Sequence, residues 1–210
     1  QPWFKLINQV VLPLSELDAV LMRKDPPVDM TYIYTNQLLE IAEKQGARVF
    51  NRPSSLCDLN EKIFASWFPD CCPPTLISAD PLEIKVFLKE QNEIIVKPLD
   101  GMGGRGIFRI SQDELNINVI LEMLTKYGEQ LIMAQRYLPE IQSGDKRVLM
   151  VHGEPIDYAL ARIPSPGEIR GNLAAGGKGV AIPLGKRERS ICEQVGPVLR
   201  EKGLFFVVLD

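Results

Sequence analysis

The chain has 210 residues, with 24 basic and 27 acidic side chains and a formal net charge of −3. A surface that binds along nucleic acid needs an excess of clustered Lys and Arg, so this mildly acidic balance excludes nucleic acid as the main partner. Hydrophobic residues make up 45% of the chain and charged residues 24%. This composition is typical of globular proteins and excludes collagen-like, fibrous and disordered classes.

The sequence favours a cytoplasmic protein with reduced thiols. No apolar run approaches the roughly 18–20 residues of a membrane span, and residues 1–5 lack the layout of a signal peptide. The four cysteines form no Cys-x-x-Cys pair, so neither a zinc site nor a disulfide framework is predicted. The chain starts without Met and stops at Asp210 directly after an apolar run, so we expect it to continue beyond both ends.

The first segment predicts an α/β unit. Residues 17–22 indicate a short buried strand, apolar residues at helical spacing predict a helix over 31–45, and 47–50 predicts a second strand. The intervening segment 23–27 is a charged turn whose two prolines stop regular structure. The run that starts at Pro53 is predicted to be a boundary.

The next segment predicts a compact α+β module. We expect a helix over 59–68, capped by Asp58 or Asn60. Lys62 lies near its first turn, where the helix dipole disfavours a cation, so we infer that Lys62 serves a ligand. The further predicted elements are a helix over 81–91, a strand over 93–97, a glycine-rich loop, a strand over 107–110, a helix over 114–127 and a strand over 131–135.

The last segment predicts an antiparallel hairpin and a long loop. Strands over 148–151 and 157–163 are joined by a short turn at His152, a residue for which we expect no catalytic role. Residues 164–179 show no periodicity, and a loop of this length inside a domain is usually functional or disordered. A helix over 188–202 and a terminal strand over 204–209 complete the pattern.

The glycine-rich loop is the most informative motif. Gly101, Gly103 and Gly106 satisfy G-x-G-x-x-G after a strand, but a strand follows instead of the helix that a dinucleotide fold requires, and no Gly-Lys-Ser/Thr completes a P-loop. One interpretation is a plain β-hairpin with a glycine turn. The other is a loop whose backbone N–H groups close over phosphate oxygens, with the Lys97 ammonium beside them.

Three further cations and one carboxylate fit the phosphate interpretation. Lys62, Arg162 and Arg170 add positive charge near flexible glycine segments, which is the inventory needed to neutralise a triphosphate. Asp210 ends an apolar strand and is either a Mg²⁺ ligand or a solvated strand end. A serine hydrolase or a metal hydrolase is not indicated, because the chain has neither a G-x-S-x-G elbow nor a His pair.

Several separate strings, in this order along nearly the whole chain, resemble the bacterial glutathione synthetases of the ATP-grasp superfamily. They are Met22-Arg23-Lys24-Asp25-Pro26-Pro27, Asn60-Glu61-Lys62, Lys97-Pro98-Leu99-Asp100-Gly101-Met102-Gly103-Gly104, Gly144-Asp145-Lys146-Arg147, Ala161-Arg162-Ile163-Pro164 and Arg170-Gly171-Asn172-Leu173-Ala174-Ala175-Gly176-Gly177. Any one string alone would identify only the wider superfamily.

The resemblance implies a mixed α+β and α/β chain with an ATP-grasp fold, in which two α+β subdomains hold ATP between them. Residues 1–58 would end a Rossmann-like N-terminal substrate-binding domain, 59–138 would form the lid subdomain, and 139–210 an incomplete C-terminal subdomain. The implied activity is ATP-dependent joining of γ-glutamylcysteine to glycine through an acyl phosphate. The implied enzyme uses Mg²⁺ or Mn²⁺ and forms a homo-oligomer, a tetramer. Alternatives are another ATP-grasp carboxylate–amine ligase and a non-catalytic ATP-binding module.

The resemblance also implies a role for each matching residue. The residues implied to contact ATP are Lys62 and Lys97 on the phosphates, Gly101, Met102, Gly103 and Gly104 in a small lid loop, Gln135, Tyr137 and Leu138 against adenine, and Asp145 on the ribose. The residues implied for chemistry and substrate are Arg147, Arg162 and Asn172 facing the transferred phosphate and acyl carboxylate, Arg23 and Arg170 for the peptide substrate, and Asp210 as a metal ligand. Residues 164–179 would close as a lid that keeps the acyl phosphate from water.

Overall fold

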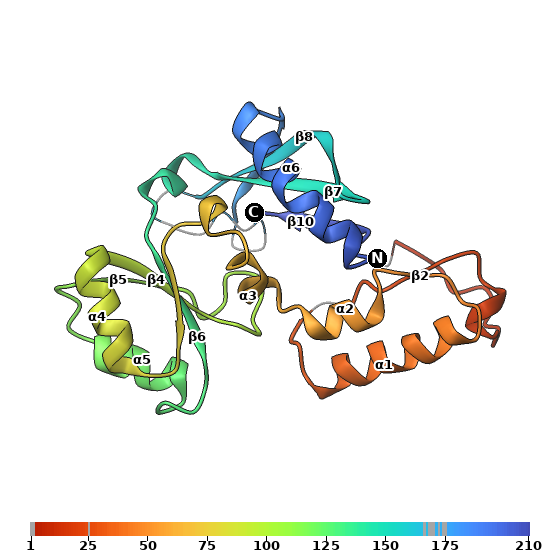
Figure 1. The fold of residues 1–210 in the computed structure, drawn as a ribbon, viewed down its shortest axis with the longest axis horizontal. Helices are drawn as coiled ribbons and strands as arrows, with labels where there is room; N and C mark the ends of the chain where they lie inside the picture. The colour runs from red at the N-terminus through yellow and green to blue at the C-terminus, as the bar shows by residue number, and fades with distance from the viewer. Residues whose placement is uncertain (1–2, 25, 166, 168–170, 172, 174–175) are drawn as a thin grey trace.

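The structure is a computed structural model that describes residues 3–24, 26–165, 167, 171, 173 and 176–210. Its elements gather in three lobes (Figure 1). The N-terminal lobe holds α1 and α2, a second lobe holds β4, β5, β6, α4 and α5, and a third holds β7, β8, β10 and α6, with the C-terminus near the centre. Among the described residues, every helix is too short or too polar to cross a membrane.

The N-terminal lobe is the predicted strand–helix–strand unit. β1 (Val20–Leu21) pairs in parallel with β2 (Val49–Phe50), and α1 (Met30–Lys44) connects them. A short 3₁₀ turn, η1 (Leu14–Glu16), precedes β1. Asp29 caps α1 by accepting a hydrogen bond from the Tyr32 N–H, and the apolar face of α1 packs Leu39 against the strands. A parallel pair requires such a crossover, so the unit follows from the periodicity of the sequence.

Two predictions for the following segment are wrong in extent. Pro53 does not end regular structure, because it opens α2 (Pro53–Asp58), where the missing N–H of a proline costs nothing. The helix predicted over 59–68 is only α3 (Glu61–Ala65), followed by turns and the 3₁₀ helix η2 (Pro69–Cys71). Of the two candidate caps, Asn60 is the cap of α3, since its side-chain oxygen accepts from the N–H groups of Lys62 and Ile63.

The second lobe is a four-stranded antiparallel sheet with two helices. Its strands follow the order β3-β6-β4-β5. The elements are β3 (Thr75–Ser78), α4 (Pro81–Gln91), β4 (Glu93–Pro98), β5 (Phe108–Ser111), α5 (Ile117–Thr125) and β6 (Ile132–Arg136). β3 was not among the predicted strands, and α5 is shorter than predicted because Lys126 and Tyr127 adopt positive φ angles that end it.

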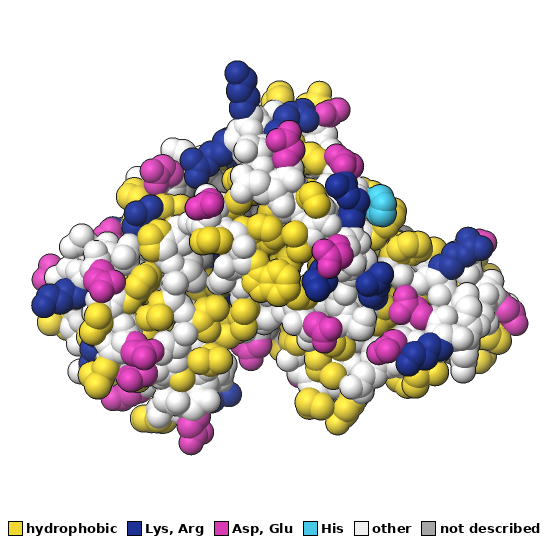
Figure 2. Space-filling view, viewed as in Figure 1, with side chains coloured by type: hydrophobic (Ala, Val, Ile, Leu, Met, Phe, Trp, Pro, Cys, Tyr) yellow, Lys and Arg dark blue, Asp and Glu magenta, His cyan; other side chains and the backbone are white. Residues whose placement is uncertain are grey.

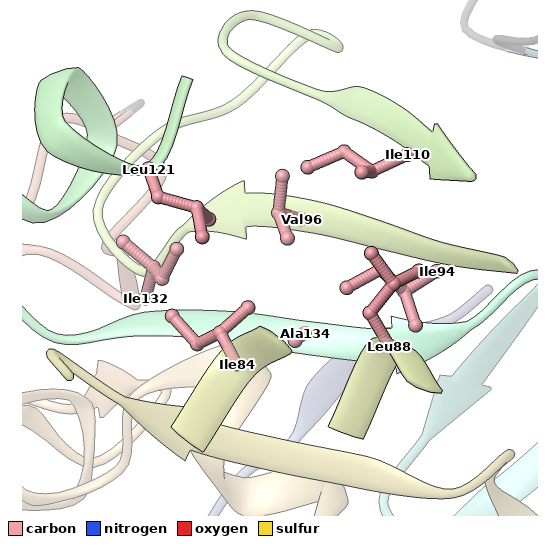
Figure 3. Packing of buried hydrophobic residues seen from close by; sticks show 8 residues of the cluster. All are labelled: Ile84, Leu88, Ile94, Val96, Ile110, Leu121, Ile132 and Ala134. Atoms are coloured by element: carbon pink, nitrogen blue, oxygen red, sulfur yellow. The ribbon is translucent and has the colours of Figure 1, made fainter. Parts of the chain in front are cut away.

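Figure 3 shows why this lobe is a self-contained core. Side chains of α4, α5 and the strands meet between helices and sheet, and each is at least 96% buried. The residues are Ile84, Leu88, Ile94, Val96, Ile110, Leu121, Ile132 and Ala134. Alternate residues of β4 face this core, which leaves the Lys97 side chain on the opposite face of the sheet.

The third lobe is a second antiparallel sheet, in the order β10-β7-β8-β9, covered by α6 (Lys186–Glu201). Its strands are β7 (Asp145–Val151), β8 (Glu154–Ile163), β9 (Lys178–Pro183) and β10 (Phe206–Leu209), and the 3₁₀ helix η3 (Pro139–Ser143) precedes them. The predicted hairpin is confirmed, with His152 in its turn at φ 51°. β9 was not predicted, because its glycine and lysine hide the strand pattern.

The segment around α3 packs against the third lobe and has an apolar surface. α3 and its neighbours contribute Phe64 and Phe68 to the core of the third lobe. On the face shown in Figure 2, hydrophobic side chains gather near the centre of the molecule, in the region where Figure 1 places α3. Ile63 and Trp67, on either side of this core contact, are 37% and 53% exposed.

Candidate active site

Two lysines converge on the glycine-rich loop from different elements. Lys62, in the first turn of α3, donates from Nζ to the carbonyl oxygens of Gly101 at 2.8 Å and Leu99 at 3.4 Å, and pairs with Glu61 at 2.9 Å. The Asn60 side chain donates to the same Leu99 carbonyl at 3.0 Å. The start of α3 therefore holds the loop in place, so that one asparagine serves as helix cap and loop anchor together.

The loop itself is compact because of its glycines. Gly103 and Gly104 have φ angles of 67° and 79°, in the left-handed region that favours glycine. A side chain at Gly101 would lie 3.2 Å from the Pro98 ring. Gly104 is buried, whereas Met102 at the tip is 44% exposed. The loop joins β4 to β5 as a hairpin, as the sequence predicts.

Lys97 lies on β4 beside this loop, and its ammonium group is largely buried. Its Nζ donates to the Gln135 side-chain oxygen at 2.7 Å, and the Gln135 amide donates in turn to the Thr75 hydroxyl at 2.9 Å. Burial lowers the pKa of Lys97 below its ordinary value, and the neighbouring Lys62 ammonium lowers it further. The two cations thus disfavour each other, and an anion between them would relieve both penalties.

Four charged side chains form a network on one face of the sheet of the third lobe, β10-β7-β8-β9. Arg162 of β8 lies opposite Asp145 of β7 and holds its two oxygens at 2.8 and 2.5 Å. Arg147 holds both oxygens of Asp210 at 2.7 and 2.6 Å, and Arg162 also reaches Asp210 at 3.1 Å. Residues 145 and 147 alternate along β7, so both point to the same face.

The network combines a buried and an exposed arginine. The Arg162 side chain is 4% exposed, whereas those of Arg147 and Asp210 are each 42% exposed. The hydrogen bonds to Asp210 raise the pKa of Arg147 above its ordinary value, which favours the charged guanidinium. Burial and Lys62 set the lowered pKa of Lys97, and the negative charge of Asp210 offsets a small part of this lowering.

Two more of the predicted residues, Tyr137 and Leu138, form the connector that leads from β6 to η3. Tyr137 directly follows β6 and is 6% exposed, and its hydroxyl has no hydrogen-bond partner among the described residues. The Tyr137 N–H donates to the Glu93 carbonyl at 2.9 Å, which extends the β6–β4 ladder by one residue. Leu138, the next residue, is 42% exposed.

Sequence reasoning missed the partner that covers this tyrosine. The Arg109 guanidinium lies 4.1 Å from the centroid of the Tyr137 ring and pairs with Glu93 at 2.6 Å. Arg109 is one residue of an alternating strand, and no local pattern marks it out. Its partners come from two other strands, so only the strand order of the sheet reveals the contact.

Three predicted residues lie apart from these clusters. Arg23 is exposed and forms no hydrogen bond or ion pair with another described residue. Arg170 and Asn172 fall outside the described residues. Within the described part of the chain, no three His, Cys, Asp or Glu side chains form a group that could hold a metal ion by themselves.

A cavity of about 350 Å³ lies elsewhere, where β2 meets the end of α6 and the start of β10. Its lining includes Arg52, His152 and Arg200, and none of the residues predicted for the site. The cavity is therefore separate from the clusters described above.

Comparisons with known proteins show the family of the chain. Residues 61–210 match the family described as prokaryotic glutathione synthetase, ATP-grasp domain, and residues 1–57 match its N-terminal domain. A glutathione synthetase of Pseudomonas aeruginosa is 58% identical over 208 residues, which are 99% of this chain and 66% of that protein. A glutathione synthetase of Escherichia coli O157:H7 is 51% identical over 210 residues, or 100% of this chain and 67% of that protein.

Solved structures extend the likeness at the level of the fold. The D-cycloserine synthetase DcsG superposes with a TM-score of 0.66 at 15% identity, covering 94% of this chain and 70% of that one. The chain spans about two thirds of the length of the curated relatives that it matches, and 66% of the Pseudomonas aeruginosa protein. The expected ATP-grasp fold is confirmed by the family match.

Proposed function

The chain belongs to the prokaryotic glutathione synthetase family, and from that premise we propose that the protein of which it is a part joins γ-glutamylcysteine to glycine at the expense of ATP. The cysteinyl carboxylate would be phosphorylated first, and the glycine amine would then attack the acyl phosphate and release phosphate. The observation that carries the proposal is the pair of lysines at the glycine-rich loop. The ammonium groups of Lys62 and Lys97 repel each other and that of Lys97 is largely buried, so a bound polyanion would stabilise both.

The phosphate end of ATP fits this part of the chain. Lys62 and Lys97 would neutralise the phosphates, and the loop from Gly101 to Gly104 would close over them with its backbone N–H groups. Lys62 already anchors that loop through the Gly101 carbonyl. A phosphate bound here would therefore contact the loop and both cations together.

The adenosine end fits the connector. The buried Tyr137 hydroxyl lacks a partner among the described residues, and a buried polar atom of this kind is normally satisfied by a ligand or water. Leu138 is exposed and apolar, as a contact for a base requires. Gln135 and Asp145 would complete the site on the base and ribose side. Asp145 must then share its carboxylate with Arg162.

Phosphoryl transfer depends on positioning and charge neutralisation, so no nucleophilic side chain is required. Arg147 and Arg162 would stabilise charge on the transferred phosphate and the acyl carboxylate, together with Asn172. A divalent ion, Mg²⁺ or Mn²⁺, would stabilise phosphate charge, and Asp210 suits it as one carboxylate ligand beside phosphate oxygens and water. Arg147 donates one hydrogen bond to each Asp210 oxygen, so the ion would share this carboxylate with the guanidinium.

The acceptor side rests on the family alone. Arg23 and Arg170 would bind the peptide substrate, with the lid formed by 164–179 closing over it, and the protein would be a homo-oligomer, a tetramer. A different ATP-grasp ligase would keep the ATP residues and change this side. A binding module without turnover would keep ATP affinity and lose the transfer step.

The experiment is ADP release by the full-length protein with Mg-ATP and γ-glutamylcysteine, with and without glycine, while glutathione is followed by mass spectrometry. Glycine-dependent ADP release matched by glutathione is the expected result. Turnover with a different amine would favour another ligase, and ATP binding without any turnover would favour the binding module. A Lys97→Ala variant that turns over as fast as the wild type would refute the assignment of the lysine pair.

A further inference from the structure

We propose that Arg109 is a positioning residue for nucleotide binding, acting through Tyr137. The inference rests on the proposed ATP site and goes beyond it, because Arg109 lies on β5 and contacts none of the residues proposed to touch the phosphates. The observation is a closed triangle of Arg109, Glu93 and Tyr137, in which each pair is joined by a contact.

Each side of the triangle restricts a different degree of freedom. The Glu93 carbonyl accepts from the Tyr137 N–H at 2.9 Å, which fixes the backbone of the connector. The Glu93 carboxylate accepts from Nη2 of Arg109 at 2.6 and 2.9 Å, which fixes the guanidinium. The guanidinium then lies 4.1 Å from the centroid of the Tyr137 ring. An aromatic face attracts a cation at this distance, so the ring is held as well.

The position of the triangle gives it a consequence for binding. Tyr137 is the first residue after β6, and 138 leads to η3 and the second sheet. These three contacts, the Arg109 clamp, thus immobilise the connector at the point where it leaves the sheet β3-β6-β4-β5. A base that stacks on the connector needs that segment in one place, because ordering a mobile segment on binding costs affinity. Arg109 supplies this order before the nucleotide arrives.

Charge alone does not explain the arrangement. The side chains of Arg109 and Glu93 are 38% and 37% exposed, and an ion pair at such a site contributes little by itself. Among the ion pairs of the described residues, this pair is the one that covers an aromatic ring, that of Tyr137, a residue 6% exposed. The pair of Arg200 and Glu154 has the same donor exposure of 38% and the same distance of 2.6 Å, with no ring beneath it.

This pair supplies a matched control for the test. Dissociation constants for ADP and GDP are measured by calorimetry on the full-length protein and its Arg109→Ala, Arg109→Lys and Arg200→Ala variants. We expect Arg109→Ala to weaken ADP binding about five- to tenfold, the size of effect that loss of one cation–π contact and a half-exposed ion pair produces. Any affinity for GDP should fall with it, because the order of the connector serves any base that stacks there. Arg109→Lys should restore most of both, and Arg200→Ala should change neither.

The outcomes separate the inference from the function beneath it. A wild-type protein that binds neither nucleotide overturns the proposed ATP site. If the wild type binds ADP and Arg109→Ala binds it with the same affinity, the role of Arg109 alone is overturned. An equal loss of affinity in Arg200→Ala overturns it as well. If Arg109→Ala does not fold, as judged by its thermal unfolding, Arg109→Gln carries the same expectation and the same refutation.

Discussion

Two arginines in the same sheet, each holding a carboxylate with two hydrogen bonds, should differ sharply in what they contribute to stability. Arg162 is 4% exposed and Arg147 is 42% exposed. Replacing each by methionine keeps the apolar stem of the side chain and removes the guanidinium. Burial is the main difference between the two residues, since both donate two hydrogen bonds to one carboxylate and Arg162 has one further contact, to Asp210.

The expected magnitudes follow from what is left behind. Removing one partner of a buried ion pair costs about 3–5 kcal/mol, because the remaining charge stays desolvated. Asp145 keeps 26% exposure and regains some hydration, so we expect about 3 kcal/mol for Arg162→Met, at the lower end of that range. Arg147→Met leaves Asp210 exposed and paired with Arg162, and we expect at most about 1 kcal/mol.

Thermal unfolding followed by circular dichroism distinguishes these values. For a chain of this size each kcal/mol shifts the midpoint by roughly 2–4 °C, so Arg162→Met should lower it by about 6–12 °C and Arg147→Met by less than about 4 °C. Equal shifts for the two variants, or a neutral Arg162→Met, would refute the reasoning that burial sets the contribution. Arg147→Met should nevertheless lose turnover, since its proposed role is at the reacting phosphate.

Three further substitutions test single features of the site. The pKa of Lys97 is lowered in the folded protein, so the unfolded chain binds this proton more tightly, and the free energy of unfolding of the wild type should rise with pH up to the ordinary value of 10.5. Denaturant unfolding across alkaline pH should show this rise in the wild type and not in Lys97→Met, and parallel profiles would contradict the prediction. Tyr137→Phe removes a buried hydroxyl without a partner, so it should stabilise the free protein by about 1 kcal/mol yet weaken ADP binding, whereas a lower melting temperature would argue against an orphaned hydroxyl. Gly144→Ala places a Cβ 2.8 Å from the Arg162 carbonyl at a φ of 99°, which should cost roughly 1–3 kcal/mol; a melting temperature equal to that of the wild type would show that this turn can relax.

The sequence by itself determined most of the elements that carry the site. Periodicity located α1, α4 and the strands on both sides of the glycine-rich loop, because burial of one face imposes a repeat of 3.6 or 2 residues. The absence of a predicted helix after the loop separates this motif from a dinucleotide fold on the sequence alone. The family strings then predict that separate loops form one nucleotide site, which periodicity cannot do.

The tertiary structure alone decided which side chains meet. Asp145 and Arg162 are 17 residues apart, and Arg147 and Asp210 are 63 apart, so their pairing depends on strand order and register in the second sheet. The Arg109 clamp has the same origin, since β4, β5 and the end of β6 become neighbours only when the first sheet forms. Local sequence sets which way a residue points along its strand, whereas long-range pairing sets what it faces.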